Sequence, residues 1–186
     1  NNLYKEIVKN KRLGDSMREA KNKSLSGVIN RNFSLLGDPS LRLTIPSYSL
    51  AITTINHQPI NEKDTLHALE KIILEGIILD ENNSFLSTYN GTISLSMWDK
   101  STNEKSLGNE SEPFLIKNRE KIYQGSGSIY EGKFTCTLII PKNITYTYGK
   151  GKITLYASDE NKKEGIGSNI TFMIGGSSLS SIEDTD

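Results

Sequence analysis

The sequence is poor in the residues that build disulfides and metal sites. It contains one cysteine, Cys136, and two histidines, His57 and His67. One cysteine cannot form an intramolecular bridge, so a disulfide-stabilised mini-protein is excluded. These three isolated residues also offer no recognisable zinc spacing, and we expect neither a metal nor another cofactor.

Long hydrophobic runs are absent too. No stretch approaches the roughly 20 apolar residues needed to cross a bilayer, so no transmembrane segment is expected. The chain begins with Asn1 rather than Met and lacks a charged segment followed by an apolar one. We therefore expect a processed product or a piece of a longer protein.

The net charge of the whole chain is zero, because it has 22 basic and 22 acidic side chains, but the charge is not evenly distributed. Residues 1–31 hold eight basic and three acidic side chains, a net charge of +5, which leaves −5 for the remainder. This asymmetry indicates two structural units. Residues 1–31 contain a single aromatic residue, Tyr4, so a solvated basic surface is favoured over nucleic-acid binding.

Residues 2–31 have the apolar spacing of two short amphipathic helices. The apolar positions are Leu3, Ile7 and Val8 in the first helix and Leu13, Met17 and Ala20 in the second. We expect a break at Gly14 and an N-cap at Asp15 or Ser16. Helices with so few large apolar groups cannot bury a core alone, so a packing partner is expected.

From Phe33 the pattern changes to short apolar stretches separated by turn residues, which is typical of an all-β domain. The expected strands are 48–55, 71–79, 92–97, 113–116, 122–129, 134–140, 153–157 and 169–174. Glu131-Gly132 predicts a tight hairpin between the fifth and sixth of these. An alternative helical turn within 64–74 is less favoured, because residues 71–79 are richer in β-branched residues. The pattern predicts an immunoglobulin-like antiparallel β-sandwich, without the Cys-Trp-Cys spacing of antibody domains.

The candidate catalytic residues are few, and none has the expected surroundings. Cys136 alternates with apolar residues, which favours a buried thiol over a nucleophile paired with His57 or His67. Residues 80–83 (DENN) lack a calcium-loop pattern, so a solvated turn is favoured there. Residues 125–127 (GSG) lack the strand–turn–helix context of a nucleophilic serine, and phosphate-binding loops are absent.

Aromatic residues could line a sugar-binding platform, but strands also favour aromatic residues for packing. The available ones are Trp98, Tyr123, Tyr130, Tyr146, Tyr148 and Tyr156. The sequence alone does not separate these two roles.

One segment carries a specific pattern, which reads NFSLLGDPSLRL over residues 32–43 and continues with Ile45-Pro46. Gly37 permits unusual dihedral angles, Pro39 fixes φ, and Leu41 and Leu43 are expected to begin a strand. The pattern resembles the end of the peptidase domain in gingipain-like cysteine peptidases. Residues 13–21 (LGDSMREAK) resemble the last helix of the same domain.

The resemblance extends downstream and covers roughly residues 13–176. The matching motifs are Asp64-Thr65-Leu66, Ala68-Leu69, Glu75-Gly76, Tyr89-Asn90-Gly91-Thr92, Trp98-Asp99-Lys100, Leu107-Gly108-Asn109, residues 134–144 and residues 148–153. They resemble the region that follows the peptidase domain in sortases of the type IX secretion system. The segment Asn56-His57-Gln58 departs from the family, which tends to have an Asn-Gly turn there.

The resemblance implies a parent protein that is a cell-surface cysteine peptidase, associated with the outer membrane of Bacteroidetes-type bacteria or secreted. It would remove C-terminal sorting domains from secreted cargo and help attach the cargo to lipopolysaccharide. The catalytic histidine and cysteine of the family lie in motifs that no position of this chain matches. No catalytic, cofactor-binding or metal-binding residue is therefore transferred, and this chain is expected not to be an enzyme by itself. Asp15-Ser16-Met17 and Asp64-Thr65-Leu66 also resemble the O-glycosylation sequons of such bacteria.

The combined interpretation divides the chain into three parts. Residues 1–46 are expected to end an upstream α/β peptidase domain, residues 47–175 to form the sandwich, and residues 176–186 to begin a linker. The expected role is support of that peptidase domain or docking of other secretion components or cargo. The alternatives are a carbohydrate- or adhesion-type binding module that uses the tyrosine-rich strands and an intrinsic cysteine hydrolase that uses Cys136.

Overall fold

The computed structural model describes residues 2–7, 11–23, 34–61, 64–105 and 115–177. The chain divides into two compact units, Asn1–Pro46 and Ser47–Asp186. Within the described ranges, no helix is both long and apolar enough to span a bilayer.

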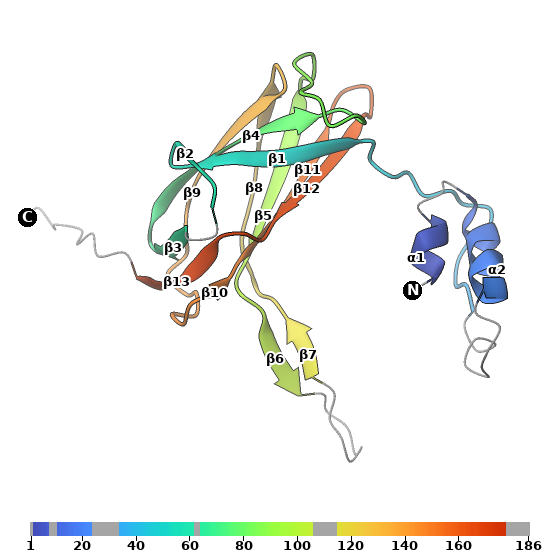
Figure 1. Ribbon diagram of the computed structural model, residues 1–186, viewed down its shortest axis with the longest axis horizontal. Coiled ribbons are helices and arrows are strands. Elements are labelled where there is room, and N and C mark those ends of the chain that lie inside the picture. Colours follow the sequence, from blue (N-terminus) through green and yellow to red (C-terminus); the bar gives the residue numbers. More distant parts are fainter. Residues whose placement is uncertain (1, 8–10, 24–33, 62–63, 106–114, 178–186) are drawn as a thin grey trace, which may run out of the picture. The chain divides into compact units, whose positions relative to one another are not determined.

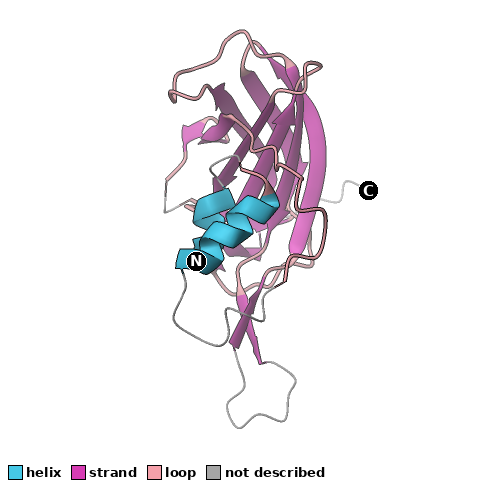
Figure 2. Ribbon diagram, turned by 90° about the vertical axis from the view of Figure 1, so that its right-hand side faces the viewer, coloured by secondary structure: helices cyan, strands magenta, loops and turns pink. Residues whose placement is uncertain are grey.

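The first unit contains two helices, α1 (Asn2–Ile7) and α2 (Leu13–Lys23), which pack side by side (Figure 2). The extended segment 34–46 returns to the start of α2, where the N–H groups of Leu13 and Gly14 donate to the carbonyls of Leu41 and Pro39 at 2.9 Å each. Two helices in this region are as predicted, although Val8 and residues 24–31 lie outside the described residues.

Three local predictions for this unit are wrong. Gly14 does not break the helical region but lies in the first turn of α2, where a Cβ would approach Pro39 Cβ to 2.8 Å. Neither Asp15 nor Ser16 is the N-cap, because the helix begins before them and the Ser16 N–H already donates to the Arg12 carbonyl. No strand begins at Leu41, since the only β contact there is an isolated bridge between Arg12 and Arg42.

The second unit is built of strands. In chain order these are β1 (Tyr48–Ile55), β2 (Gln58–Pro59), β3 (Thr65–Ala68), β4 (Lys71–Leu79), β5 (Gly91–Trp98), β6 (Thr102–Lys105), β7 (Leu115–Asn118), β8 (Lys121–Tyr130), β9 (Lys133–Ile139), β10 (Gly149–Lys150), β11 (Lys152–Ser158), β12 (Glu164–Asn169) and β13 (Met173–Ser177).

Seven of these strands form a sheet that closes on itself (Figure 1). The order is β12-β11-β5-β8-β9-β4-β1, the pairing of the first residues of β1 with β12 closes the ring, and β2 pairs with the last residues of β1. Neighbouring strands run antiparallel except β1 and β12, which run parallel. The prediction of a mainly β, largely antiparallel domain is confirmed, and the sheet is barrel-like.

The core of the second unit follows from the alternation of side chains along the strands. β5 buries Ile93, Leu95 and Met97, while β11 buries Ile153 and Leu155. β1, β3, β4, β8, β9, β13 and the connecting loops contribute further members of one contiguous cluster. Two smaller sheets, β10-β13-β3 and β6-β7, adjoin this body.

Several sequence-based boundaries agree with the structure. β1 and β4 have the predicted limits, and residues 64–74 contain β3, a short turn and the start of β4 rather than a helix. The hairpin at Glu131-Gly132 is confirmed, with φ angles of 48° and 74° at the two turn residues. Both values lie in the left-handed region that a tight β-turn of this type requires.

Other boundaries differ. The strand predicted at 169–174 is interrupted, because the Asn169 side chain accepts hydrogen bonds from the Thr171 N–H and hydroxyl and turns the chain. β12 instead occupies 164–169. β13 extends through Ser177, two residues into the expected linker, while residues 178–186 and 113–114 lie outside the described residues.

Candidate functional site

Two adjacent charged residues lie buried at the end of β5. Asp99 is 4% and Lys100 8% exposed, and both belong to the Trp98-Asp99-Lys100 motif. Burying a charge is costly unless it is paired and hydrogen-bonded. The surroundings of this pair therefore decide what it does.

The Asp99 carboxylate is fully partnered. Its Oδ1 accepts the Lys100 N–H at 2.7 Å and lies 3.3 Å from Lys100 Nζ, and its Oδ2 accepts the Thr145 N–H at 3.1 Å. Lys100 Nζ also donates to the Thr145 carbonyl. The pair thus clamps the segment around Thr145 to the end of β5.

Gly149 makes room for the lysine stem. A Cβ at Gly149 would lie 2.7 Å from Lys100 Cδ and 2.9 Å from its Cβ. Two motifs that are separate in the sequence, around residues 98–100 and 148–153, therefore meet here. Because every charged atom of the pair has a partner, we assign it a structural role rather than a reactive one.

Arg119 joins the same corner from the connection between β7 and β8. Its Nη1 donates to the Asp99 carbonyl at 3.1 Å and to the Lys150 carbonyl at 2.9 Å. The Asp99 N–H donates to the Glu120 carbonyl at 2.8 Å. One guanidinium thus connects the end of β5 with β10.

A hollow of about 390 Å³ opens outside this corner, and Trp98, Ser101, Arg119 and Lys152 line it. The indole N–H of Trp98 donates to Thr154 Oγ1 at 3.3 Å, and Lys121 Nζ lies 5.2 Å from the indole centroid. This hollow combines one aromatic ring with cationic side chains.

A second hollow, of about 690 Å³, lies among the loops that follow β11 and precede β5. Its lining comprises Thr88, Asn90, Gly91, Thr92, Ser158, Asp159, Glu160 and Asn161. The polar side chains there are engaged with the loops themselves: Asn90 Oδ1 accepts the Glu131 N–H and Asp159 Oδ1 accepts the Lys163 N–H. Burial, with a smaller contribution from Asp159, raises the pKa of the adjacent Tyr89 hydroxyl to about 12. That phenol remains a hydrogen-bond donor, to the Lys163 carbonyl.

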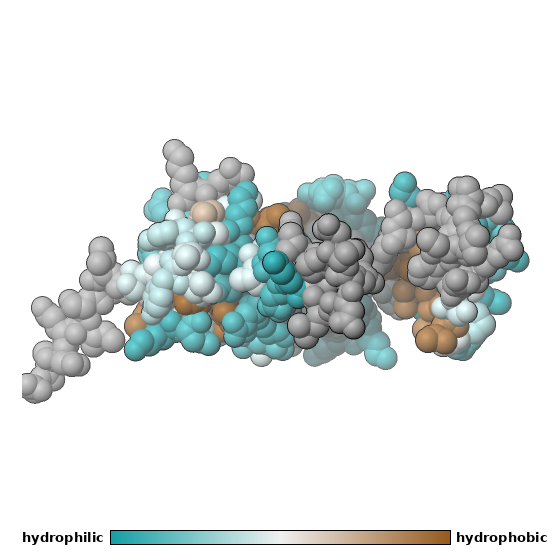
Figure 3. Space-filling model, turned by 90° about the horizontal axis from the view of Figure 1, so that it is seen from below, coloured by the Kyte–Doolittle hydropathy of each residue, from teal (hydrophilic) through white to brown (hydrophobic). Residues whose placement is uncertain are grey.

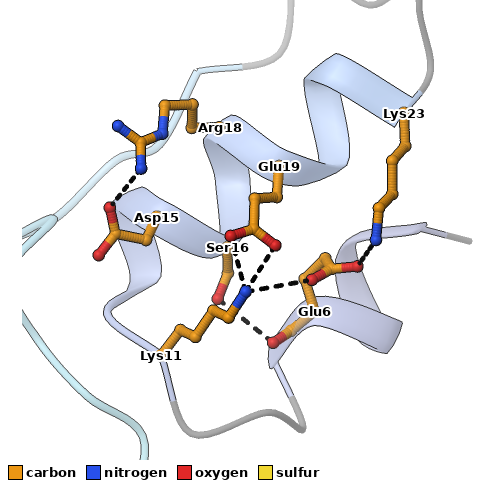
Figure 4. A network of polar contacts seen from close by, with 7 residues as sticks. All are labelled: Glu6, Lys11, Asp15, Ser16, Arg18, Glu19 and Lys23. Carbon is orange, nitrogen blue, oxygen red and sulfur yellow. Dashed lines mark hydrogen bonds and ion pairs between the residues drawn. The ribbon is translucent and has the colours of Figure 1, made fainter.

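The first unit contains a separate charge network (Figure 4). Glu6 is 1% exposed and contacts Lys23 Nζ, while Lys11 Nζ lies 3.9 Å from Glu6 and 2.6 Å from Glu19. The Ser16 hydroxyl donates to the Glu6 carbonyl at 3.4 Å. The network joins α1 to α2 and pairs part of the basic charge of residues 1–31.

The structure does not bring the sequence-derived catalytic candidates together. Cys136 is half-buried on β9, and burial raises the pKa of its thiol. His57 Nδ1 lies 3.1 Å from Glu75 Oε2, and His67 Nδ1 lies 2.9 Å from the Gly175 carbonyl. Among the described residues, neither ring contacts Cys136.

The remaining candidates have ordinary structural roles. Asp80 Oδ1 accepts the N–H groups of Asn82 and Ser84 and so closes its own turn. No cluster of three or more potential metal ligands occurs in the described part of the chain. Residues 125–127 lie within β8, and the Ser16 hydroxyl of the first sequon is buried in the folded unit.

The aromatic candidates divide by exposure. Tyr130, Tyr146, Tyr148 and Tyr156 are exposed, whereas Trp98 and Tyr123 are half-buried. Arg119, Lys121 and Lys152 were not predicted as site residues. The strand register, which pairs Trp98 with Lys121 and with Lys152, indicates the two lysines, and the hydrogen bonds of Arg119 indicate the third cation.

The chain is similar to solved structures of other proteins. No family model and no curated protein matches the chain. The crystal structure of dimeric latent PorU from Porphyromonas gingivalis is similar at a TM-score of 0.62 and 29% identity, over 94% of this chain and 17% of that one. Spo0M, a sporulation control protein from Bacillus subtilis, aligns at a TM-score of 0.40 and 13% identity, over 71% of this chain and 51% of that one. The resemblance expected from the motifs is therefore confirmed: nearly the whole chain is PorU-like and corresponds to about one sixth of PorU.

Proposed function

We propose that this chain is a non-catalytic support segment of a larger cysteine peptidase that resembles PorU. Residues 1–46 complete an upstream peptidase domain, and residues 47–175 form a sandwich that supports it or docks partners. The proposal rests on a segment of the first unit whose apolar side chains are exposed to solvent.

That segment lies between residues 35 and 45. Leu36 is 95% exposed, and the other exposed apolar side chains are Leu35, Leu41, Leu43 and Ile45. The unit to which the segment belongs, on the right in Figure 3, shows hydrophobic surface. Contiguous exposed apolar surface marks an interaction site, and burying one leucine fully contributes about 1.5–3 kcal/mol.

The strand pairing supports an immunoglobulin-like interpretation of the second unit. β8 and β9 share two residue pairs, as do β1 and β12, whereas the ladders within β1-β4-β9 and within β12-β11-β5-β8 are longer. Two sheets that meet only at such short joins correspond to the two layers of a sandwich.

The activity of the parent follows from the resemblance alone. By that resemblance the parent is a sortase of the type IX secretion system that removes sorting domains from cargo at the cell surface. Its catalytic residues would lie upstream of this chain, and the partners would include that upstream domain, secretion components or cargo.

The test is a binding titration of the chain with the separately expressed upstream part of its parent. We expect association, and we expect Leu36→Ser with Leu41→Ser to weaken it about tenfold or more. Ile170→Ser is the control, because Ile170 is also exposed but lies in the second unit. Lack of association, or equal weakening by the control, would refute the proposal.

The alternative function, a carbohydrate-type binding module, is favoured by one specific feature. This feature is the aromatic and cationic hollow beside Trp98, rather than the exposed tyrosines.

A further inference from the structure

Trp98 lies in a row of cationic residues that crosses three strands. In the ladder of β5 with β11, Trp98 is directly opposite Lys152, and in the ladder of β5 with β8 it is opposite Lys121. Side chains directly opposite each other in a sheet lie on the same face. The indole therefore has a lysine on each side.

A β-bulge produces half of this arrangement. The register of β8 shifts so that Met97 pairs with Tyr123 and Trp98 pairs with Lys121, which leaves Ile122 as the extra residue. Bulges re-aim side chains in this way. The result is the 5.2 Å distance between Lys121 Nζ and the indole centroid.

Arg119 and Lys152 are the two cations in the lining of the hollow, and the orientation of Arg119 is fixed by the two carbonyl groups that its Nη1 contacts. The lining residues include no acidic side chain. The nearby carboxylate of Asp99 is buried and satisfied by Lys100 and Thr145. The hollow thus carries positive charge that its own lining does not neutralise, and walls of one sign concentrate ligands of the other sign.

On β11, β5 and β8, the two rows beyond the hollow consist of uncharged hydrogen-bonding side chains, and a carboxylate lies at their edge, where the Tyr156 hydroxyl donates to Glu164 Oε1 at 2.6 Å. The next row across the strands consists of Thr154, Ser96 and Gln124, and the row after it of Tyr156, Ser94 and Ser126. These side chains are half-buried or exposed. Hydroxyl and amide groups both donate and accept hydrogen bonds, as sugar hydroxyls do.

We propose that the hollow lined by Trp98, Arg119 and Lys152, with Lys121 beside it at the indole, binds an anionic saccharide. The indole packs against the apolar face of a sugar ring, and the three cations pair with a phosphate, sulfate or carboxylate group on that sugar. The rows of hydroxyl and amide side chains receive the neighbouring sugar units. The inference does not depend on the support role proposed above.

The neighbouring rows favour a saccharide over an acidic peptide. An acidic peptide needs further cations or apolar pockets along its length, and the rows that follow the hollow provide neither. A chain of sugar units needs many hydroxyl partners and one flat apolar surface, and the face provides both.

The full chain can be tested directly, because Trp98 is its only tryptophan and its fluorescence reports on the hollow. The probes are tetragalacturonate and glucose 6-phosphate, compared with neutral maltotetraose and with tetraglutamate. We expect a saturable fluorescence change with at least one anionic sugar, weaker binding as salt is raised, and little response to maltotetraose.

Lys152→Ala should weaken this binding about fivefold, as loss of one partly exposed ion pair does. Lys150→Ala removes the same charge two residues away from an exposed position outside the lining, and should have little effect. The proposal is overturned if neither anionic sugar binds, if maltotetraose binds equally well, or if both substitutions act alike. Tetraglutamate binding at equal affinity would also overturn it, in favour of an acidic-peptide site.

Discussion

Asp99 and Lys100 show how single residues can hold a loop by burying charge. The carboxylate is enclosed by Lys100 and Thr145, and the ammonium group reaches the Thr145 carbonyl. Removing one partner of such a buried pair leaves the other charge uncompensated, which typically costs about 3–5 kcal/mol. This corner should therefore be sensitive to a change of either residue.

We expect Lys100→Met to lower the free energy of unfolding by about 3 kcal/mol. Urea unfolding followed by Trp98 fluorescence measures the change. Adding Asp99→Asn should restore part of the loss, because the uncompensated charge is then removed. Lys150→Met, at an exposed position, is the control, and a loss in Lys100→Met no larger than in this control would contradict the structural role.

Glu75 offers a test of a local hydrogen bond through pH. The Thr54 hydroxyl donates to Glu75 Oε2 at 2.6 Å, and this bond, followed by the contact with His57, lowers the pKa of Glu75 below its ordinary 4.5. The carboxylate therefore stabilises the fold above pH 4.5, and this contribution is lost as the pH falls through the lowered pKa.

An NMR titration of the Glu75 carboxyl carbon should give a midpoint below 4.5 in the wild type and a higher one in Thr54→Val. Thr53→Val is the matched control, because the Thr53 hydroxyl donates to the Glu75 backbone carbonyl and not to its side chain. An equal rise in both variants would mean that the Thr54 hydroxyl does not set the pKa.

At the scale of elements, β12 determines whether the sheet closes. It lies beside β1, where a Cβ at Gly167 would approach the Leu50 carbonyl oxygen to 2.1 Å. No real Cβ tolerates a backbone atom at that distance, so glycine is required by space at this position. Gly127 on β8 is different, since a Cβ there would meet only ordinary contacts at 3.5 Å and 3.7 Å.

Gly167→Ala should lower the free energy of unfolding by about 2 kcal/mol, in the range for overpacking, because β1 or β12 must shift. Gly127→Ala should change it by no more than about 0.5 kcal/mol, or stabilise slightly through the unfolded state. Urea denaturation of both variants compares them. Similar stabilities would show that β1 and β12 do not approach this closely.

The strands that could be predicted from the sequence differ in composition from β12, which could not. β5, β9 and β11 carry their own apolar alternation, so each could be predicted from its own residues. β12 reads EGIGSN and has little apolar signal, because its glycines serve the close approach of β1. A strand whose residues are small because a neighbouring strand lies close shows no hydrophobic periodicity, so the sequence pattern does not predict it.

The candidate site could be predicted only in part, because it depends on contacts between residues that are far apart in the sequence. Trp98 and the Asp99-Lys100 dipeptide were noticed as motifs, but their burial depends on Thr145, Gly149 and Arg119 from other elements. The cationic row depends on register and on one bulge. Long-range pairing of this kind is not encoded in local spacing.

At the scale of the whole molecule, the two units have different sources of stability. The second unit buries a large contiguous apolar cluster. Among the described residues, the first buries Ala20 as its only buried apolar side chain, together with the charged Glu6 and the polar Ser16. A unit with so small a core depends on its polar network and should open at a low free-energy cost.

Glu6→Ala should therefore act on one unit alone. In the full chain, we expect amide hydrogen exchange in α1 and α2 to become about tenfold faster or more, while β4, β5 and β11 keep their protection. The reason is that Glu6 joins α1 to Lys11 and to Lys23 of α2, which all belong to the first unit. Glu81→Ala, in an exposed turn of the second unit, should leave the helices unchanged. If the substitution of Glu6 also accelerated exchange throughout the strands, the two units would unfold as one cooperative body, and the small core of the first would not be its weak point.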